Sequence, residues 1–468
     1  MTKGWTDIAL LLEGYRAGKF KPSQVTEYYL ERIKKYNPIL NAFITVTEVE
    51  AMQKAQELDA QMDKVGSYPL FGVPVAFKDL FQTAGIRTTA GSKVLENYIG
   101  QYDSTAVQRY LDAGAIMLGK LNCDAWAHGS SGENSDFGPT KNPWNTEYVP
   151  GGSSSGSAAA VAADLCLVAS GTDTGGSIRC PADYCGVIGL KPTYGRVSRY
   201  GIIAMASSLD SIGHMTQNAA DAARVLEVTA GFDAHDATTS SKPVDKYAAF
   251  AKKNLQGIRV GVPKEYVSTD PDVTKLTAAA INKLQQLGAQ IKQVSLPHTA
   301  AALADYYIIQ PAEVSSNLAR YDGIRFGHDR SAFGAEAKRR IMLGTYTLSA
   351  GYYDAYYKTA QKVRTLIVDD FSQVFRNVDV LAAPVTPHLP FKIGEKVADP
   401  LSLYLEDVLA VPVNLAGLPA ISVPCGFSQS KLPVGFQLIG PKFCEKLLFE
   451  VARVYEQSTS WHEHHPTL

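Results

Sequence analysis

The sequence has few cysteines, no long hydrophobic run and almost no net charge. Its 468 residues include only six cysteines, too few for a disulfide-based scaffold, which indicates reduced thiols. No stretch approaches the roughly 18 consecutive apolar residues of a membrane-spanning helix, and residues 1–20 lack a signal-peptide pattern. The 45 basic and 46 acidic residues leave a net charge of −1, so no broad nucleic-acid-binding surface is expected. These absences predict a soluble, cytoplasmic protein that does not associate with membranes.

Hydrophobic residues make up 46% of the chain, which is enough for a large buried core. Short strand-like runs such as "GVPVAFKDLF" (72–81) alternate with helical patterns such as "STAVQRYLDAG" (104–114). This alternation favours α/β layers. In the N-terminal part, Ser23 is predicted to cap a helix over residues 24–37, and near the C-terminus "AISVPCGF" and "VGFQLIG" are predicted to pair.

No internal repeat and no charged linker divides the chain, so a single domain over residues 1–468 is expected. We predict four parts within it: a helical N-terminal part (1–65), a core (66–230), a helical elaboration (231–400) and C-terminal strands with a closing helix (401–468).

Three stretches carry candidate chemistry. Lys78 ends an apolar strand, where a lysine is costly to bury; the plain alternative is a side chain that reaches solvent. "PGGSSSGSAAA" (150–160) runs into a small-residue helix, but a flexible linker or a serine helix cap has the same composition. "GTDTGGSIRCPADYCG" (171–186) sets two glycines before Ser177, which suits either a tight turn or a row of backbone N–H donors for an oxyanion.

A serine hydroxyl attacks a carbonyl only when a base takes its proton. His128 is the nearest candidate among the histidines, but its context is unlike a hydrolase triad. A buried lysine can replace histidine, because desolvation lowers its pKa. A relay from Ser177 through a second serine to Lys78 is therefore the favoured hypothesis. Arg179 is expected to hold the turn through a carboxylate such as Asp173, and Cys180 and Cys185 are expected to pack.

These three stretches together resemble the amidase signature family, at Lys78, at residues 151–154 and at residues 173–182. The resemblance implies an α/β fold with a large mixed central β-sheet covered by helices on both faces. It also implies that Ser177 is the nucleophile, Ser153 (in a cis peptide) the relay and Lys78 the neutral base. The backbone N–H groups of Thr174, Gly175, Gly176 and Ser177 would form the oxyanion hole.

Other stretches, including residues 313–327, 336–367 and 411–427, are similar to one branch of that family, the glutaminase subunits of tRNA-dependent amidotransferases. The resemblance implies that Arg340 binds the carboxylate of free glutamine, Asp407 its ammonium, and that Tyr306 lines the pocket. It further implies two partners, the B and C subunits of a heterotrimer, with tRNA bound mainly by the B subunit. No metal or cofactor is then expected in this chain, and ATP and Mg²⁺ would belong to the B subunit. Either Glu-tRNA(Gln) or Asp-tRNA(Asn) would be the substrate that is amidated.

Two other functions stay open at this point. A stand-alone amidase for small or lipid amides would keep the Lys78–Ser153–Ser177 relay but would not need the Arg340 and Asp407 pair. A scaffold subunit without catalysis would need neither, and the intact relay residues disfavour it. The segment 327–334 is shorter than in many members of the branch, which leaves the shape of the pocket near Arg340 undefined.

Overall fold

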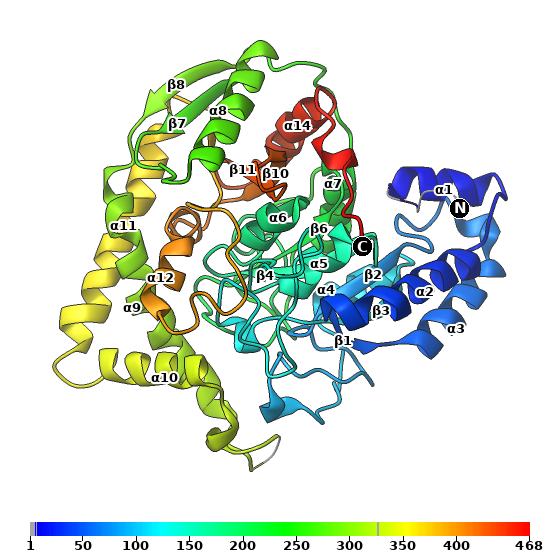
Figure 1. Cartoon of the computed structure of the whole chain (residues 1–468), viewed down its shortest axis with the longest axis horizontal. Coiled ribbons are helices and arrows are strands. Elements are labelled where there is room, and N and C mark those ends of the chain that lie inside the picture. Colours follow the sequence, from blue (N-terminus) through cyan, green and yellow to red (C-terminus); the bar gives the residue numbers. More distant parts are fainter. Residues whose placement is uncertain (1–4, 6, 325–326) are drawn as a thin grey trace.

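One mixed β-sheet runs through the chain in the computed structural model, which describes residues 5, 7–324 and 327–468 (Figure 1). Its eleven strands within those residues follow the order β1-β3-β2-β4-β6-β5-β10-β11-β9-β7-β8. The strands are β1 (Phe43–Val46), β2 (Pro74–Lys78), β3 (Ile116–Leu121), β4 (Val168–Asp173), β5 (Ile188–Lys191), β6 (Ser211–Thr216), β7 (Arg259–Pro263), β8 (Gln290–Val294), β9 (Val380–Pro384), β10 (Ala420–Phe427) and β11 (Pro433–Ile439).

Helices surround this sheet. The N-terminal group α1–α3 lies at one end of the molecule, and α9–α11 lie at the opposite end (Figure 1). The helices are α1 (Ile8–Arg16), α2 (Pro22–Leu40), α3 (Glu48–Asp59), α4 (Thr105–Asp112), α5 (Ser155–Ala162), α6 (Arg179–Cys185), α7 (Ala219–Thr229), α8 (Pro271–Gln286), α9 (Ala302–Asn317), α10 (Ala335–Thr347), α11 (Lys358–Val374), α12 (Pro400–Tyr404), α13 (Val411–Leu415) and α14 (Glu445–Glu456). The predicted α/β class with a mixed sheet is confirmed.

The sheet combines parallel and antiparallel pairs. β2 pairs in parallel with both β3 and β4, whereas β4, β6, β5, β10, β11 and β9 form a continuous antiparallel series. The predicted pairing of the two C-terminal strands is confirmed, because β10 and β11 are antiparallel neighbours. Each of the four predicted parts contributes at least one strand, so no part has a sheet of its own. The division into those parts stays a prediction.

Two N-terminal expectations are wrong. Helix α2 begins at Pro22 with Lys21 as its cap residue, and Ser23 lies inside the first turn, where its hydroxyl donates to Asp59 (Oγ–Oδ2 2.5 Å). Proline is favoured at the first helical position, which explains the earlier start. The second error is β1, because its four residues sit in a part predicted to be helical. The four-residue pattern "FITV" is too short to predict a strand, and the strand is stabilised by its antiparallel pairing with β3.

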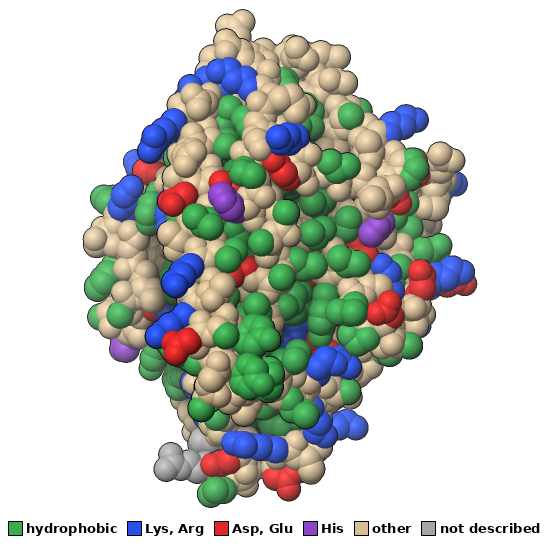
Figure 2. Space-filling model, turned by 90° about the vertical axis from the view of Figure 1, so that its left-hand side faces the viewer, with side chains coloured by type: hydrophobic (Ala, Val, Ile, Leu, Met, Phe, Trp, Pro, Cys, Tyr) green, Lys and Arg blue, Asp and Glu red, His purple; other side chains and the backbone are tan. Residues whose placement is uncertain are grey.

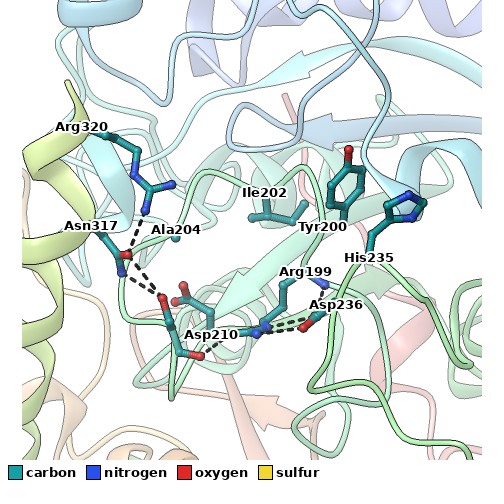
Figure 3. A pocket seen from close by; sticks show the side chains of 10 residues that line it. Arg199, Tyr200, Ile202, Ala204, Asp210, His235, Asp236, Asn317 and Arg320 are labelled. Atoms are coloured by element: carbon teal, nitrogen blue, oxygen red, sulfur yellow. Dashed lines mark hydrogen bonds and ion pairs between the residues drawn. The ribbon is translucent and has the colours of Figure 1, made fainter.

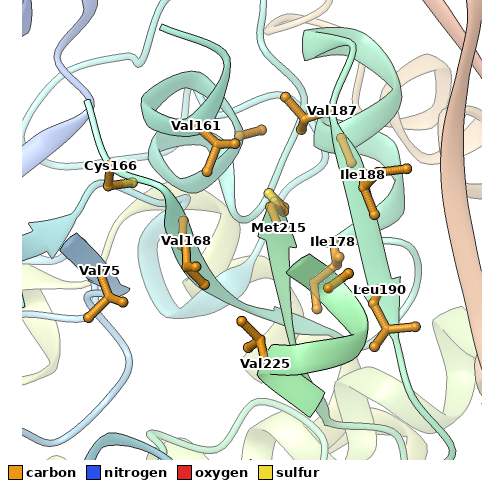
Figure 4. Close-up of a cluster of buried hydrophobic side chains, with 14 of the residues drawn as sticks. Val75, Val161, Cys166, Val168, Ile178, Val187, Ile188, Leu190, Met215 and Val225 are labelled. Carbon is orange, nitrogen blue, oxygen red and sulfur yellow. The ribbon is translucent and has the colours of Figure 1, made fainter. Parts of the chain in front are cut away.

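The core beside α6 is packed from small and branched side chains, including Val168, Ile178, Ile188 and Met215 (Figure 4). Gly171 and Gly213 are direct partners across β4 and β6. A Cβ on Gly171 would lie 2.8 Å from Ile178 Cγ1, and one on Gly213 would lie 2.9 Å from Ile178 Cδ1. Because Ile178 follows Ser177, these glycines let the turn that carries Ser177 sit directly on the sheet.

Replacement of Gly213 by valine tests this close contact. The new Cβ would also lie 2.0 Å from the Leu190 carbonyl oxygen, so the strand must move. We expect Gly213→Val to lower the free energy of unfolding by about 1–3 kcal/mol or more, measured by urea titration. Gly66→Ala is the control, because no atom lies within 4 Å of its added Cβ. Equal stability of both variants would contradict the packing argument.

Among the residues described, no helix is both long enough and apolar enough to cross a bilayer. All six cysteines are unpaired, as expected from their sparse distribution. Residues 325 and 326, which fall in one of the stretches that resemble the glutaminase branch, lie outside the described residues.

Candidate active site

Lys78 is the last residue of β2 and its side chain is fully buried. Its Nζ lies 2.7 Å from Ser153 Oγ, 2.9 Å from Ser154 Oγ and 2.8 Å from Thr172 Oγ1. Thr172 is on the neighbouring parallel strand β4, and the two serines come from the loop before α5. The alternative interpretation of Lys78 as a solvent-seeking side chain is therefore wrong.

The protonation of Lys78 follows from these surroundings. Burial lowers its pKa from 10.5 to about 8, because the charged ammonium loses its hydration. A neutral amine has two N–H groups and one lone pair. The Ser154 hydroxyl is 3.2 Å from the Thr172 carbonyl oxygen and donates to it, so Ser154 can only accept from Lys78. With Ser154 and Thr172 accepting the two N–H groups of the neutral amine, its lone pair is left to accept the proton of Ser153.

The loop that carries Ser153 is a rigid part of the core. The Gly152–Ser153 peptide bond is cis, and residues 150–157 are buried throughout, which rules out the flexible-linker interpretation. A Cβ on Gly152 would lie 2.0 Å from Asp124 Oδ2. The Asp124 backbone N–H donates to the Ser153 carbonyl (3.2 Å), and the Asp124 carboxylate accepts the N–H groups of Gly132 and Asn134. Asp124 thus holds the Ser153 loop against the segment that contains Gly132 and Asn134.

Ser177 lies in the turn between β4 and α6, 8% exposed. The Ser154 backbone N–H donates to the Ser177 carbonyl oxygen (3.2 Å), which joins this turn to the Ser153 loop. Within the described residues the Ser177 hydroxyl has no hydrogen-bond partner. The structure therefore connects Lys78 with Ser153 directly, and it joins the Ser177 turn to the Ser153 loop through the Ser154–Ser177 backbone hydrogen bond.

The backbone donors of the turn are of two kinds. The Gly176 N–H donates to Asp173 Oδ1 (2.8 Å), so it holds the turn. The N–H groups of Thr174, Gly175 and Ser177 have no partner in the part of the chain that the structure describes. An oxyanion hole needs free, fixed donors. Three of the four expected donors are thus free of other partners, Gly176 is engaged with Asp173, and the oxyanion hole stays a prediction.

Two further contacts shape the turn. A Cβ on Gly175 would lie 2.8 Å from Tyr306 Cζ, so glycine is needed for the buried Tyr306 ring to lie against the turn. On another side, the Thr174 hydroxyl donates to Asp210 Oδ1 (2.8 Å). Asp210 also lines a small pocket with Arg199 and other residues (Figure 3). The turn is thus held from two directions by side chains distant in sequence.

Arg340 and Glu336 lie on successive turns of α10. The Arg340 guanidinium is 3% exposed; its Nε donates to Glu336 Oε1 (2.8 Å) and its Nη1 to Gln310 Oε1 (2.9 Å). Its Cζ lies 5.3 Å from the ring centroid of Tyr307 and 5.4 Å from that of Tyr404. Aromatic faces stabilise a desolvated guanidinium. Glu336 already offsets part of the Arg340 charge, and among the described residues the Arg340 Nη2 has no hydrogen-bond partner, so it is the group left to bind a carboxylate.

Asp407 ends the short 3₁₀ turn Leu405–Asp407, between α12 and α13. Its Oδ2 accepts the Tyr307 hydroxyl (2.9 Å), and burial raises its pKa to about 7. Tyr307 touches both Asp407 and Arg340, so the two expected substrate residues share one neighbour. A bound ammonium would favour the ionised carboxylate.

Known proteins with similar sequences place the chain in a family. The family model described as "Amidase" matches residues 24–449. The A subunit of the glutamyl-tRNA(Gln) amidotransferase of Trichlorobacter lovleyi is 53% identical over 456 residues, 94% of each chain. The chain belongs to the amidase signature family.

Solved structures of the amidase family agree. The A subunit of the glutamyl-tRNA(Gln) amidotransferase of Thermotoga maritima is 44% identical, with a TM-score of 0.80 over 94% of this chain and 92% of that one. The native peptide amidase of Stenotrophomonas maltophilia is 32% identical, with a TM-score of 0.83 over 97% of each chain. The protein is thus an amidase whose fold and sequence resemble the amidotransferase subunits across almost their full length.

Several residues of this amidase site were missed in the sequence. The hydroxyl groups of Ser154 and Thr172 contact the Lys78 amine. Thr172 lies two residues after Ser170 on the same face of β4, and the Ser170 hydroxyl accepts the backbone N–H of Lys78 (2.9 Å). Tyr307 is adjacent to the predicted Tyr306 on α9. Because neighbouring residues of a helix point in different directions, Tyr306 lies against the Ser177 turn and Tyr307 contacts Asp407 and Arg340. Asn414 and Gln437 had no signal, because their partners are distant in sequence.

The remaining candidates are placed as follows. His128 is buried, its pKa is lowered well below the usual range by burial, and neither ring nitrogen has a partner within the described residues. Cys180 and Cys185 are buried, as expected for packing residues. The predicted Arg179–Asp173 pair is formed (Nε–Oδ2 3.1 Å). In the segment 327–334, the ring of Phe333 packs against Trp126, with the ring centroids 5.2 Å apart.

Proposed function

We propose that this amidase is the glutaminase subunit of a tRNA-dependent amidotransferase. The observation that carries the proposal is the placement of Arg340 and Asp407, two groups of opposite charge, around Tyr307, whose neighbour Tyr306 lies against the Ser177 turn. Free glutamine needs a cation for its carboxylate and an anion for its ammonium. An amidase for neutral amides needs neither. The identity to amidotransferase subunits exceeds that to the peptide amidase, which supports the same choice.

The relay residues have distinct roles in this proposal. Ser177 Oγ attacks the side-chain carbonyl carbon of glutamine while Ser153 takes its proton and passes its own to neutral Lys78. The oxyanion is bound by the N–H groups of Thr174, Gly175 and Ser177. The proton returns through Ser153 to the leaving nitrogen, the C–N bond breaks, and ammonia departs from a γ-glutamyl ester. Water then hydrolyses the ester by the same relay and glutamate leaves.

The ammonia is consumed on another subunit. Amidation of Glu-tRNA(Gln) or Asp-tRNA(Asn) requires an activated carboxyl group, and we assign ATP, Mg²⁺ and most of the tRNA contact to the B subunit, with the C subunit completing the heterotrimer. The names of the relatives favour Glu-tRNA(Gln). Exposed apolar side chains near the site, such as Met342 (72%) and Leu401 (73%), suit a face that partners cover; Figure 2 shows apolar side chains gathered in a hollow on that side of the molecule. The complex would act in the cytoplasm, where translation takes place.

Removal of the nucleophile separates the two half-reactions. In the complex reconstituted with the B and C subunits, we expect Ser177→Ala to reduce glutamine hydrolysis at least about 1,000-fold, because no ester can form. Transamidation supplied with ammonium chloride should stay unchanged. Retained glutaminase activity would show that another group is the nucleophile, and loss of both activities would point to failed assembly.

The rate should depend on the protonation of Lys78. Below its pKa the amine holds its proton and cannot accept another, so kcat for glutamine hydrolysis should rise with pH and level off above an inflection near about 8. The kcat profile is the measurement, because Asp407 titrates near about 7 in the free enzyme and affects kcat/KM. A kcat profile without an inflection at about 8 would exclude Lys78 as the base.

Arg340→Ala tests the glutamine pocket. Loss of a charge-assisted contact should raise KM for glutamine about 10- to 100-fold, and ammonia-dependent transamidation should stay within twofold. Arg339→Ala is the matched control: it lies on the same helix and also pairs with Glu336, but it faces solvent more. If wild type hydrolyses simple amides but not glutamine, even with its partners, the stand-alone amidase is the better description.

A further inference from the structure

A buried polar network connects the Ser177 turn to the segment that carries Asp407. Its members are Asp173 and Arg179 beside the turn, Asn414 on α13 and Gln437 on β11; none is more than 2% exposed. A buried polar group without a partner is costly, so such a network has one preferred arrangement. None of the four touches the glutamine or the relay in the mechanism above, and that mechanism leaves their purpose open.

Asp173 organises the turn from within. Its Oδ1 accepts the Gly176 N–H (2.8 Å), and its Oδ2 accepts the N–H groups of Ile178 (3.2 Å) and Arg179 (3.4 Å). Burial alone would raise the pKa of Asp173, but the Arg179 guanidinium outweighs it and holds the pKa well below its usual range. Asp173 is thus a permanent carboxylate around which the backbone of the turn is wrapped.

Asn414 holds Asp173 and Arg179 together. Its Nδ2 donates to Asp173 Oδ1 (2.8 Å) and to the Asp173 carbonyl oxygen (3.0 Å), and its Oδ1 accepts Arg179 Nη2 (2.6 Å). One amide therefore contacts both the side chain and the main chain of the residue that precedes Thr174. An apolar residue of the same size would remove three hydrogen bonds from this buried network.

The same network reaches back to the Asp407 segment. Arg179 Nη2 donates to the Ala410 carbonyl oxygen (3.1 Å), and Gln437 Nε2 donates to the Leu409 carbonyl oxygen (2.9 Å). Gln437 Oε1 in turn accepts Arg179 Nη1 (2.9 Å). Leu409 and Ala410 follow Asp407 by two and three residues and lead directly into α13. Asp407 and the oxyanion donors are therefore anchored to one guanidinium.

We infer that Asn414 is a positioning residue that couples the Asp407 segment to the Ser177 turn, so that binding of a substrate ammonium and the geometry of the oxyanion donors are set together. Through Arg179 and Asp173, a displacement of residues 407–410 is carried to the Gly176 N–H and so to the donors next to it. The inference rests on the proposed function, because it takes Asp407 as the ammonium ligand. A merely structural Asn414 would stabilise the fold without linking the two places.

A double-mutant cycle tests the coupling. The variants are Asn414→Ala, Asp407→Asn and the double variant, each assayed for kcat/KM on glutamine. If the two residues are coupled, kcat/KM of the double variant should be at least about 5-fold higher than the value obtained by multiplying the two single losses. The reason is that the first substitution already breaks the coupling on which the second would act. Independent effects that multiply to within about twofold would overturn the inference. Gln217→Ala, which removes another buried amide that donates to a backbone carbonyl (2.6 Å), is the control.

A second measurement does not depend on glutamine. Labelling of Ser177 by a fluorophosphonate reports the nucleophile and its oxyanion donors alone. Asn414→Ala should slow labelling at least about 10-fold, whereas Gln217→Ala should not change the labelling rate constant. If glutamine proves inert in wild type but the labelling pattern holds, the proposed substrate fails and the positioning role stands. If Asn414→Ala is labelled at the wild-type rate, the positioning role fails.

Folding is checked in the same samples by urea titration. Should Asn414→Ala not fold, Asn414→Asp replaces it, because it keeps the size and the acceptor for Arg179 while it replaces both donors to Asp173. That variant should show the same slow labelling, and labelling at the wild-type rate would again overturn the inference.

Discussion

The chemistry of this site depends on keeping one amine out of water. Lys78 is enclosed on β2, and a shift of its pKa from 10.5 to about 8 corresponds to roughly 3 kcal/mol of lost stabilisation of the ammonium. The three hydroxyl groups around Nζ satisfy its hydrogen bonds without adding a countercharge. A carboxylate in their place would restore the charged form and remove the base. Hydroxyl neighbours are therefore what keeps a lysine basic and buried at once.

The enclosure of Lys78 requires loops and strands to approach more closely than ordinary side chains allow. Glycines at positions 152, 171 and 175 each stand where a Cβ would meet another part of the site: the carboxylate of Asp124, the side chain of Ile178 and the ring of Tyr306. Direct contact at these positions restricts how far these parts of the site can move. This rigidity matters because free backbone donors stabilise an oxyanion only if they need no rearrangement.

The sequence singles out Lys78 and the two serine stretches, whereas it gives no signal for the polar residues around them, for a physical reason. Lys78, Ser153 and Ser177 lie in short local patterns whose composition is unusual in itself. The α/β class also follows from alternating periodicity. By contrast, Asn414 and Gln437 are single polar residues in apolar strands and helices, and their partners lie hundreds of positions away or on another strand. Nothing local distinguishes them from any other polar residue. Strand β1 was missed because its stability comes from β3.

The division of the network between charge and amide groups also has a reason. Asp173 and Arg179 form a fully buried ion pair, which is costly to desolvate and stabilises the fold only when every remaining donor and acceptor is satisfied. Asn414 and Gln437 supply those remaining bonds, and each does so with an amide that offers a donor and an acceptor together. An amide flipped about its axis would set like groups against each other, so each amide has one orientation. The Asp173–Arg179 ion pair supplies the charge-assisted bonds of the network, and the two amides fix the orientation of those bonds. Both therefore determine the conformation of the turn before Ser177.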